Sequence, residues 1–318
     1  MLKYFLIGLI AFMAALFLLL FLVTFIPYLL TFYNGNKFSY EDSVNHLLEG
    51  EEYDKYKDIT IVGIKKANEY PHEDYFIKSR DGKKLHGRFY KFRDNAPIVL
   101  ELHGYKGNCV RDLGGGLQYD KEEGYNIFAI DLRGHGLSSG RTISFGIKER
   151  YDVLDWVEFL NKEFNNPTIF LYGISMGAAT VLMASSFTYP KNVKGIIADC
   201  PYSSPEEIVV KVANDLGVKP WFSRPILNIS AWLYGHFNLK ESSPIEEVKN
   251  TTLPILIIHG LEDTFVPYEM SERIKESNPE MIRLSLFEGA PHGFSCYEDL
   301  DRYFKEIRDF QNEMIEKE

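Results

Sequence analysis

The chain has 318 residues, 45% of them hydrophobic, and a formal net charge of −10 at pH 7. Such a composition excludes disorder of the whole chain, and the acidic balance argues against nucleic acid as the main partner. The length is enough for one large α/β domain or two small ones. The three cysteines are too few and too scattered for a disulfide framework or a metal cluster: Cys109, Cys200 and Cys296.

The first predicted element is the uncharged segment Tyr4–Tyr33, in which 26 of 30 residues are hydrophobic. A bilayer is crossed by about 20 apolar residues, and no second uncharged run approaches that length. A cleaved signal peptide has a shorter apolar core of ~7–15 residues and a small-residue cleavage site, which the residues after Tyr33 do not supply. We therefore expect a single-pass membrane anchor over residues 1–33, in which Pro27 allows a kink or a helix end. Three residues fall where an aromatic belt is expected: Tyr28, Phe32 and Tyr33.

The orientation of this anchor is predicted from its flanking lysines. Lys3 precedes the segment, whereas Lys37 follows it and is soon offset by Glu41 and Asp42. The positive-inside rule then slightly favours a cytoplasmic amino terminus. We expect a protein of the cell membrane whose large domain is extracytoplasmic.

Residues 34–73 are predicted to form a connector that includes a first strand. A short helix is expected around Ser43–Glu49 and a strand over Ile59–Ile64. The large domain is expected over 74–318. It begins with a hairpin, because apolar runs flank the turn signal Asp81-Gly82.

Beyond the hairpin, short apolar runs alternate with helical stretches, which predicts a mostly parallel sheet flanked by helices in an α/β fold. The expected strands are Ile98–Leu102, Ile127–Ile130, Ile169–Tyr172, Ile196–Ala198, Ile255–Ile258 and Leu284–Phe287. The clearest helices are Lys148–Phe164, Gly177–Ser186, Tyr268–Glu276 and Tyr297–Glu316. In such sheets chemistry gathers at the carboxyl ends of strands, so the residues after each run are the candidates for a site.

A G-x-S-x-G motif, Gly173-Ile174-Ser175-Met176-Gly177, follows one of these strands and enters a helix. A serine on a sharp strand-to-helix turn needs strained backbone angles and small neighbours. The turn also points the N–H of Met176 at an oxyanion formed on Ser175. This pattern predicts Ser175 as a nucleophile and Met176 as an oxyanion-hole donor.

The loop after Ile98–Leu102 reads His103-Gly104-Tyr105-Lys106-Gly107-Asn108. Its glycines let the backbone approach a ligand, and the N–H of Tyr105 is the natural second oxyanion donor. We expect His103 to shape this loop rather than to act as a base.

Two late strand ends supply the groups that activate a serine. A serine hydroxyl needs an imidazole as general base, and the imidazole needs a carboxylate to orient it. Asp263 and His292 each follow a late strand, and the order Ser, Asp, His suits this sheet type. Glu262 and Asp199 are the alternative acids.

The glycine-rich loop Asp131–Gly140 contains a histidine, His135, but we expect the loop to be structural. Asp131 and Arg133 are positioned to pair with each other. The glycines tighten the loop beneath the nucleophile turn.

Together, the segments HGYKGN, DLRGHGLSSG, GISMG, HGLEDTFVP and GAPHG resemble those of the α/β-hydrolases, in the serine-aminopeptidase-like and monoacylglycerol-lipase-like group and its membrane-anchored bacterial members. The resemblance covers roughly 74–310. It implies Ser175, Asp263 and His292 as a catalytic triad, with Tyr105 and Met176 as oxyanion donors. It implies neither a metal nor an organic cofactor.

Substrate choice is expected in a cap, for which we expect an insertion at about 203–250 between two strands of the sheet. Ser204–Leu216 is predicted to be an amphipathic helix, and an aromatic stretch follows it. Aromatic side chains over a pocket indicate an apolar acyl or aromatic group, although they can equally pack the cap onto the core. The candidate substrate-binding residues are Trp221, Phe222, Trp232 and Tyr234.

These features predict a membrane-anchored serine hydrolase that cleaves carboxylic esters, such as a carboxylesterase, a lysophospholipase or a monoacylglycerol lipase. Because the triad chemistry is shared, a peptidase, an amidase or an acyltransferase is the alternative. A tethered binding protein without activity is a third hypothesis, which the complete set of catalytic groups disfavours. The expected partners are a small ester or lipid-like substrate and the membrane. The sequence does not predict an oligomeric state.

Overall fold

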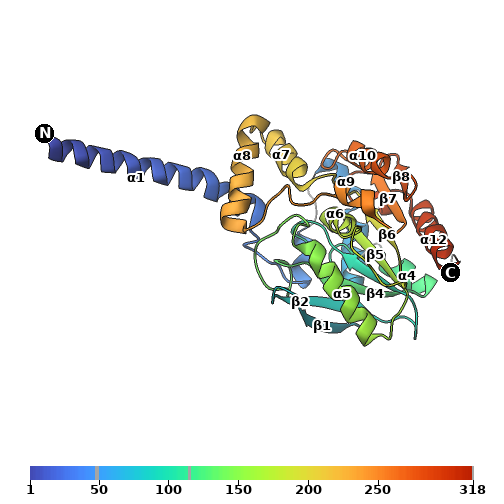
Figure 1. Cartoon of the computed structure of the whole chain (residues 1–318). Helices are drawn as coiled ribbons and strands as arrows, with labels where there is room; N and C mark the ends of the chain where they lie inside the picture. Colours follow the sequence, from blue (N-terminus) through green and yellow to red (C-terminus); the bar gives the residue numbers. More distant parts are fainter. Residues whose placement is uncertain (47–49, 114–115, 317–318) are drawn as a thin grey trace.

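The computed structural model describes residues 1–46, 50–113 and 116–316. A long helix, α1 (Leu2–Pro27), projects from a body built around one eight-stranded sheet, and the carboxy terminus lies on the opposite side of that body (Figure 1). The strand order is β1-β2-β4-β3-β5-β6-β7-β8. The strands are β1 (Glu73–Lys78), β2 (Lys84–Tyr90), β3 (Ile98–Leu102), β4 (Asn126–Asp131), β5 (Ile169–Ile174), β6 (Val193–Asp199), β7 (Ile255–Gly260) and β8 (Ile282–Phe287).

The predicted mostly parallel sheet is confirmed. Strands β3 to β8 pair in parallel with one another. Strands β1 and β2 form the predicted hairpin, and β2 pairs antiparallel with β4. The chain goes from β3 to β4 on one side and then returns to β5 on the other. Since β3 and β5 pair directly, the loops at their carboxyl ends lie side by side. This reversal is the position where ligands bind in open α/β sheets.

Helices cover both faces of the sheet, as the apolar strands require. One face packs against α5 (Glu149–Glu163), α6 (Met176–Met183) and α10 (Glu269–Ser277), and the other against α4 (Leu117–Glu123) and α12 (Leu300–Glu316). Successive residues of a strand alternate between the two cores. In β5, Ile169 and Leu171 pack in the first core and Phe170 in the second.

The end of α1 is packed into the body. After α1 the chain continues as a π-helical turn, η1 (Tyr28–Phe32). Phe32 is fully buried and makes edge contacts with the rings of Phe145 and Phe237. Pro27 is the last residue of α1, where the α-helix passes into η1. The predicted aromatic belt is wrong for Tyr28 and Phe32, because both side chains are buried in protein.

Residues Ile59–Ile64, predicted as a strand, lie in a helix, α3 (Lys57–Glu69). The β-branched residues there suggested a strand, but Thr60, Gly63, Ile64 and Ala67 are buried at helical spacing. The helix expected around Ser43–Glu49 is a short 3-10 turn, η2 (Glu41–Asn45), and residues 47–49 lie outside the described residues. A further short helix is α2 (Glu51–Asp54).

The helix predicted over Tyr297–Glu316 is divided at Asp299 into α11 (Ser295–Glu298) and α12. The carboxylate of Asp299 accepts a hydrogen bond from the backbone N–H of Arg302 at 3.0 Å, which caps the start of α12. Aspartate favours such a cap over a helix interior, so the chain begins a new helix there.

Between β6 and β7 the chain forms the helices of an insertion that covers the carboxyl ends of the strands. They are α7 (Pro205–Asp215), α8 (Pro220–Ser230), the π-helical turn η3 (Ala231–Gly235), α9 (Pro244–Glu247) and the 3-10 turn η4 (Val248–Asn250). Helix α8 lies against the end of α1 (Figure 1). The hydroxyl of Ser230 donates to the carbonyl of Thr24 at 2.6 Å, and the Thr24 and Tyr234 hydroxyls are 3.1 Å apart.

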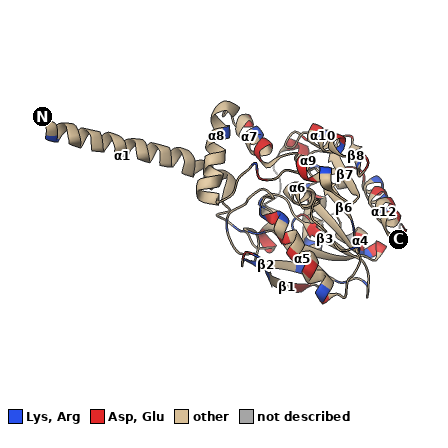
Figure 2. Cartoon of the chain, in the orientation of Figure 1, with Lys and Arg blue, Asp and Glu red and all other residues tan. Residues whose placement is uncertain are grey.

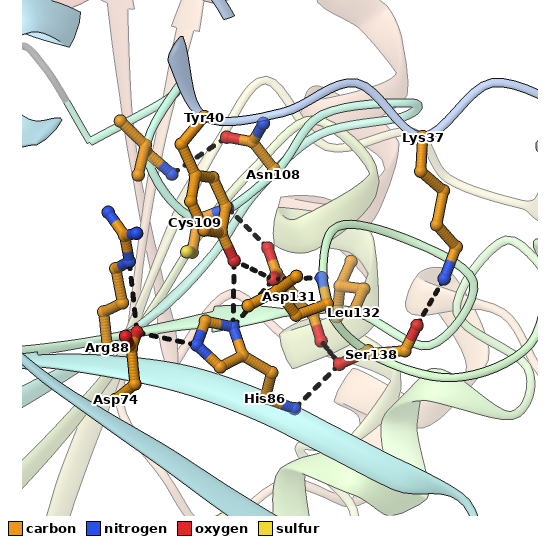
Figure 3. A network of polar contacts seen from close by, with 12 residues as sticks. Lys37, Tyr40, Asp74, His86, Arg88, Asn108, Cys109, Asp131, Leu132 and Ser138 are labelled. Carbon is orange, nitrogen blue, oxygen red and sulfur yellow. Dashed lines mark hydrogen bonds and ion pairs between the residues drawn. The ribbon is translucent and has the colours of Figure 1, made fainter. Parts of the chain in front are cut away.

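A buried polar network attaches the segment after α1 to the sheet (Figure 3). Asp131, at the end of β4, lies 2.8 Å from Nδ1 of His86 and accepts the hydroxyl hydrogen of Tyr40 at 2.5 Å. The backbone N–H groups of Cys109 and Leu137 also donate to it. Burial opposes ionisation, but these donors, His86 above all, hold the pKa of the Asp131 carboxyl below its ordinary value.

The predicted pairing of Asp131 with Arg133 is therefore wrong. Arg133 instead lies between Asp152 and Asp81, with N···O distances of 2.5 and 2.9 Å. His135 is buried, and its Nδ1 lies 3.0 Å from the carbonyl of Arg133. The turns of the loop Asp131–Gly140 are thus held by hydrogen bonds and ion pairs, which agrees with its predicted structural role.

We expect Asp131→Ala to lower the free energy of unfolding by about 3–5 kcal/mol, because it leaves His86 and Tyr40 buried without their acceptor. Denaturant unfolding of the detergent-solubilised chain measures this. Since the folded pKa of Asp131 is depressed, its contribution is present above the unfolded value and is lost as pH falls. The difference in unfolding free energy between wild type and variant should shrink below about pH 4.

Asp94→Ala, at an exposed ion pair with Lys91, is the control and should change stability by less than about 0.5 kcal/mol. An equal loss in both variants would contradict the role of the network.

Candidate active site

The turn after β5 holds Ser175 in a strained conformation, with φ 54° and ψ −113°. The residues two positions before and two positions after Ser175 must be glycine. A Cβ on Gly173 would lie 2.3 Å from the backbone of Gly177, and a Cβ on Gly177 would lie 2.1 Å from the carbonyl oxygen of Leu102. Strain that the surrounding structure maintains in this way is typical of functional positions.

Ser175, His292 and Asp263 are brought into one line of hydrogen bonds from three different strand ends. The Oγ of Ser175 lies 2.8 Å from Nε2 of His292, and Nδ1 of His292 lies 2.6 Å from Oδ2 of Asp263. With the imidazole neutral, its Nδ1–H donates to the carboxylate and its Nε2 accepts the serine proton. This geometry allows the imidazole to act as a general base toward Ser175.

The carboxylate of Asp263 is kept charged by its surroundings. Its Oδ1 accepts the N–H groups of Phe265 and Val266 at 3.0 and 2.7 Å. Burial alone would raise the pKa of Asp263, but His292 and then His259 hold it below its ordinary value. A carboxylate ionised throughout the neutral range can stabilise an imidazolium beside it.

Neither alternative acid contacts His292. Glu262 is exposed. Asp199 accepts a hydrogen bond from the hydroxyl of Tyr303 at 2.8 Å, and burial raises the pKa of its carboxyl to about 6. The structure thus places Asp263, and neither of the two alternatives, against the imidazole.

Two backbone N–H groups, those of Met176 and Tyr105, are the predicted oxyanion donors. Met176 is the first residue of α6, so its N–H has no acceptor within the helix. Tyr105 lies in the loop after β3, beside the turn of β5. Its side chain points away from the sheet, where its hydroxyl donates to the carbonyl of Thr31 at 2.8 Å and its ring stacks on Phe145. The loop is therefore fastened to the turn that ends the anchor helix.

Ser175 lies on the wall of a cavity of about 630 Å³ whose lining is mostly apolar. Three parts of the chain form it: the last turns of α1 with η1, the helices α7 and α8, and the loops around Ser175. Its lining from α1 and η1 is Leu22, Val23, Ile26, Pro27, Leu30 and Thr31. From the insertion it includes Ile208, Val209, Val212, Phe222, Ile226 and Leu227.

Of the four aromatic residues predicted to bind substrate, Phe222 alone lines this cavity. Tyr234 instead packs its ring on Phe25, at a centroid distance of 5.0 Å, and so holds α8 and η3 on α1. Trp221 and Trp232 point outward and are 79% and 67% exposed. The prediction is corrected for these three residues, because a helix has two faces and the sequence does not say which one covers the site.

A smaller cavity of about 140 Å³ also reaches Ser175 and His292. Its lining is more polar and includes Thr60 of α3, Arg111 and Asp112. Ser175 therefore borders both a large apolar cavity and a smaller, more polar one.

Two functional features escaped the sequence analysis. The first is His259, which lies near the end of β7. Its Nε2 lies 3.1 Å from Asp263, and its Nδ1 lies 2.6 Å from Oγ of Ser271. Its position at a strand end was a usable signal. The second feature is the contribution of α1 to the cavity wall, which no local pattern indicates.

Two groups of side chains have metal-ligand chemistry, but both are committed to hydrogen bonds. His86, Cys109 and Asp131 form one, and Cys200 with Asp263 and His292 forms the other. Burial raises the thiol pKa of Cys109 and of Cys200, which disfavours the thiolate that binds metal. The expectation of no metal stays a prediction.

Two family models match the chain. The one described as serine aminopeptidase, S33, matches residues 94–246, and the dienelactone hydrolase family matches 222–314. The uncharacterized protein YqkD of Bacillus subtilis is 27% identical over 242 residues, which cover 76% of this chain and 79% of that protein. Human ABHD12B is 24% identical over 230 residues, or 64% of this chain and 58% of its own length.

Solved structures share the architecture. The Pyrococcus furiosus esterase Pf2001 superposes with a TM-score of 0.65 at 20% identity, covering 89% of this chain and 98% of the esterase. The acylaminoacyl peptidase of Pyrococcus horikoshii has a TM-score of 0.57 at 20% identity, over 76% of this chain and 41% of the peptidase. At these identities the likeness concerns the fold alone. An esterase and a peptidase are both among the structures that share it.

Proposed function

Because the chain belongs to the α/β-hydrolase superfamily, we propose that it is a membrane-anchored serine hydrolase that cleaves carboxylic esters through an acyl-enzyme. One observation carries the proposal: the hydrogen-bonded line Ser175–His292–Asp263 lies at the wall of an apolar cavity of about 630 Å³. The substrate we favour is an ester of a fatty acid, of the lysophospholipid or monoacylglycerol kind.

In the first half of the reaction, Oγ of Ser175 attacks the carbonyl carbon while its proton passes to Nε2 of His292. The carbonyl oxygen becomes an oxyanion that accepts hydrogen bonds from the N–H groups of Met176 and Tyr105. As the carbon–oxygen bond to the alcohol breaks, His292 returns the proton to the departing oxygen. The alcohol leaves and Ser175 remains acylated.

In the second half, water replaces the alcohol. His292 takes a proton from the water as its oxygen attacks the acyl carbon, and the same two N–H groups hold the second oxyanion. Collapse of this intermediate breaks the bond to Oγ, which regains its proton from His292. The carboxylic acid leaves, and Asp263 has stabilised the imidazolium in both halves.

The two cavities support an ester of a long acyl chain with a small alcohol. The large apolar cavity suits a hydrocarbon chain, because burial of each methylene contributes about 0.8 kcal/mol. The small cavity offers Arg111 and Thr60 to a polar alcohol portion. A substrate placed in this way has its carbonyl at Ser175, between the two.

The packing of α1 supports an uncleaved anchor. The helix is long and apolar enough to cross a membrane, by length and composition. Loss of the segment would empty the pocket that buries Phe32. It would also leave the backbone N–H of Ile143 without its acceptor, the carbonyl of Phe32, 2.8 Å away. A signal sequence designed for removal has no need of such contacts. The extracytoplasmic placement of the body stays a prediction.

Hydrolysis of p-nitrophenyl esters of increasing chain length, beside an aminoacyl anilide, tests the substrate class. We expect kcat/KM to rise from the acetate toward medium and long chains, since each buried methylene adds up to about fourfold. Turnover of the anilide alone would contradict the ester proposal and favour a peptidase. A rate that does not change with chain length would contradict the assignment of the large cavity to the acyl chain.

A further inference from the structure

We propose that α1 is a wall of the substrate-binding site, and that the acyl chain reaches Ser175 from the bilayer through the opening between α1 and α8. The inference rests on the proposed ester hydrolase and adds the route and binding place of its acyl chain. An anchor that only tethered the enzyme would leave the site complete without it.

The face of α1 that lines the cavity follows helical spacing. Leu22, Ile26 and Leu30 stand one turn apart, and Val23, Pro27 and Thr31 form a parallel row beside them. Opposite this face, across the cavity, stand Phe222 and Ile226 of α8 and Val209 of α7. Apolar side chains of α1 thus supply one full side of the space that leads to Ser175.

The cavity is open along this side. Ile26 and Leu30 line it and are nevertheless 47% and 69% exposed, so they border an opening rather than a closed wall. An opening bordered by exposed aliphatic side chains is costly in water and favourable in a lipid environment. Among the described residues that line the cavity, Lys106 is the one charged side chain, and burial lowers its pKa.

The length of α1 places this opening at the membrane surface. Residues 1–20 are all exposed, and the first ring that packs on the body is that of Phe21, which lies 6.3 Å from Tyr234. Twenty helical residues extend about 30 Å, which is the thickness of the hydrocarbon core. When these residues span the bilayer, Leu22–Thr31 and the opening lie at its interface.

The surface of the insertion beside α1 has the composition of an interfacial region. Trp221 and Trp232 stand eleven residues apart along α8 and η3, and both are largely exposed. Tryptophan is enriched at the level of lipid headgroups. The other members of this surface are Leu216, Phe222, Ile229 and Leu233. Figure 2 shows α1 without charged residues beyond its first turn, whereas α8 beside it carries one basic residue, Arg224, and most of the acidic and basic residues lie on the body. The six residues would rest in the interface around the opening.

A covalent probe tests the route directly. The full-length protein in phosphatidylcholine vesicles is treated with a long-chain alkyl fluorophosphonate whose chain ends in a diazirine. Attack by Ser175 forms the Oγ–phosphorus bond and releases fluoride, so the alkyl chain occupies the place of the acyl chain. After irradiation, we expect cross-links in peptides that contain Leu22–Thr31 and in those of α8. Labelling at Ser175 with cross-links only to residues of the small cavity, such as Thr60 or Tyr297, would overturn the inference and leave the proposed function intact. Absence of labelling at Ser175 would overturn both.

A bulky substitution supplies an independent test. We expect Ile26→Trp to fill the opening and to lower the ratio of kcat/KM for p-nitrophenyl dodecanoate to that for the acetate about tenfold or more. The matched control is Ile10→Trp, the same change in the lipid-exposed part of the same helix. Equal chain-length profiles for the two variants would contradict a role of α1 in binding. A circular dichroism spectrum and an unfolding midpoint equal to those of wild type show that the variant is folded.

Discussion

The Ser175→Ala variant is expected to lose ester hydrolysis by a factor on the order of 10⁶ in kcat, with little change in stability. The hydroxyl is the group that forms the acyl-enzyme, and no other side chain stands at the same strained turn to replace it. The methyl of alanine fits where the serine Cβ lies, so the fold should be retained. Hydrolysis of a p-nitrophenyl ester by the purified full-length proteins measures the loss.

Ser185→Ala is the matched control for this result. Ser185 is also buried and lies just after α6, but its hydroxyl has no hydrogen-bond partner among the described residues. We expect this variant to keep its activity. Residual activity of Ser175→Ala near the wild-type level would place the nucleophile elsewhere and refute the triad.

The Asp263→Asn variant is expected to fold and to lose about 10⁴-fold in kcat. Asparagine has nearly the shape of aspartate and can still accept the N–H groups of Phe265 and Val266 on its carbonyl oxygen. Its amide nitrogen would then face His292, where it donates and so favours the tautomer with Nδ1 as acceptor. In that tautomer Nε2 carries the proton and cannot take the one on Ser175.

The pH dependence separates this effect from a general disturbance of the site. A base that has lost its carboxylate should be partly rescued at high pH, where hydroxide replaces it, whereas a misfolded site should not recover. Glu262→Gln is the control for charge, since Glu262 neighbours Asp263 but is exposed. Full activity of Asp263→Asn would transfer the role of the acid to Asp199.

Much of this fold was accessible from the sequence because each strand carries its own signal. The runs that became β3, β5 and β7 are apolar on both faces, as strands covered on two sides must be. The residues after them belong to the site because parallel strands deliver their carboxyl ends to one edge. For this reason Ser175, Asp263 and His292 could be named together although they are far apart in the chain.

The errors concern choices that depend on tertiary packing. The β-branched run Ile59–Ile64 is helical because Ile64 and Ala67 find a buried surface at helical spacing. The aromatic residues of the insertion divide between the cavity and the exterior, and only the docking of α8 on α1 decides which is which. A single sequence contains no signal for that docking.

The same reason explains why the anchor was predicted only as an anchor. Its apolar character predicts insertion in a membrane on every side of the helix equally. One side of the helix, from Leu22 to Thr31, faces the cavity. This orientation results from contacts such as those of Ser230 with Thr24 and of Tyr105 with Thr31. These contacts join residues separated by more than 70 positions in the chain.

Labelling with a fluorophosphonate, followed by identification of the modified peptide, tests the central claim most directly. The account predicts that the wild-type protein is labelled on Ser175 and that Ser175→Ala remains unlabelled. An ester substrate added before the probe should compete with the labelling. A wild-type protein that is folded but not labelled, or one labelled on a residue other than Ser175, would contradict it.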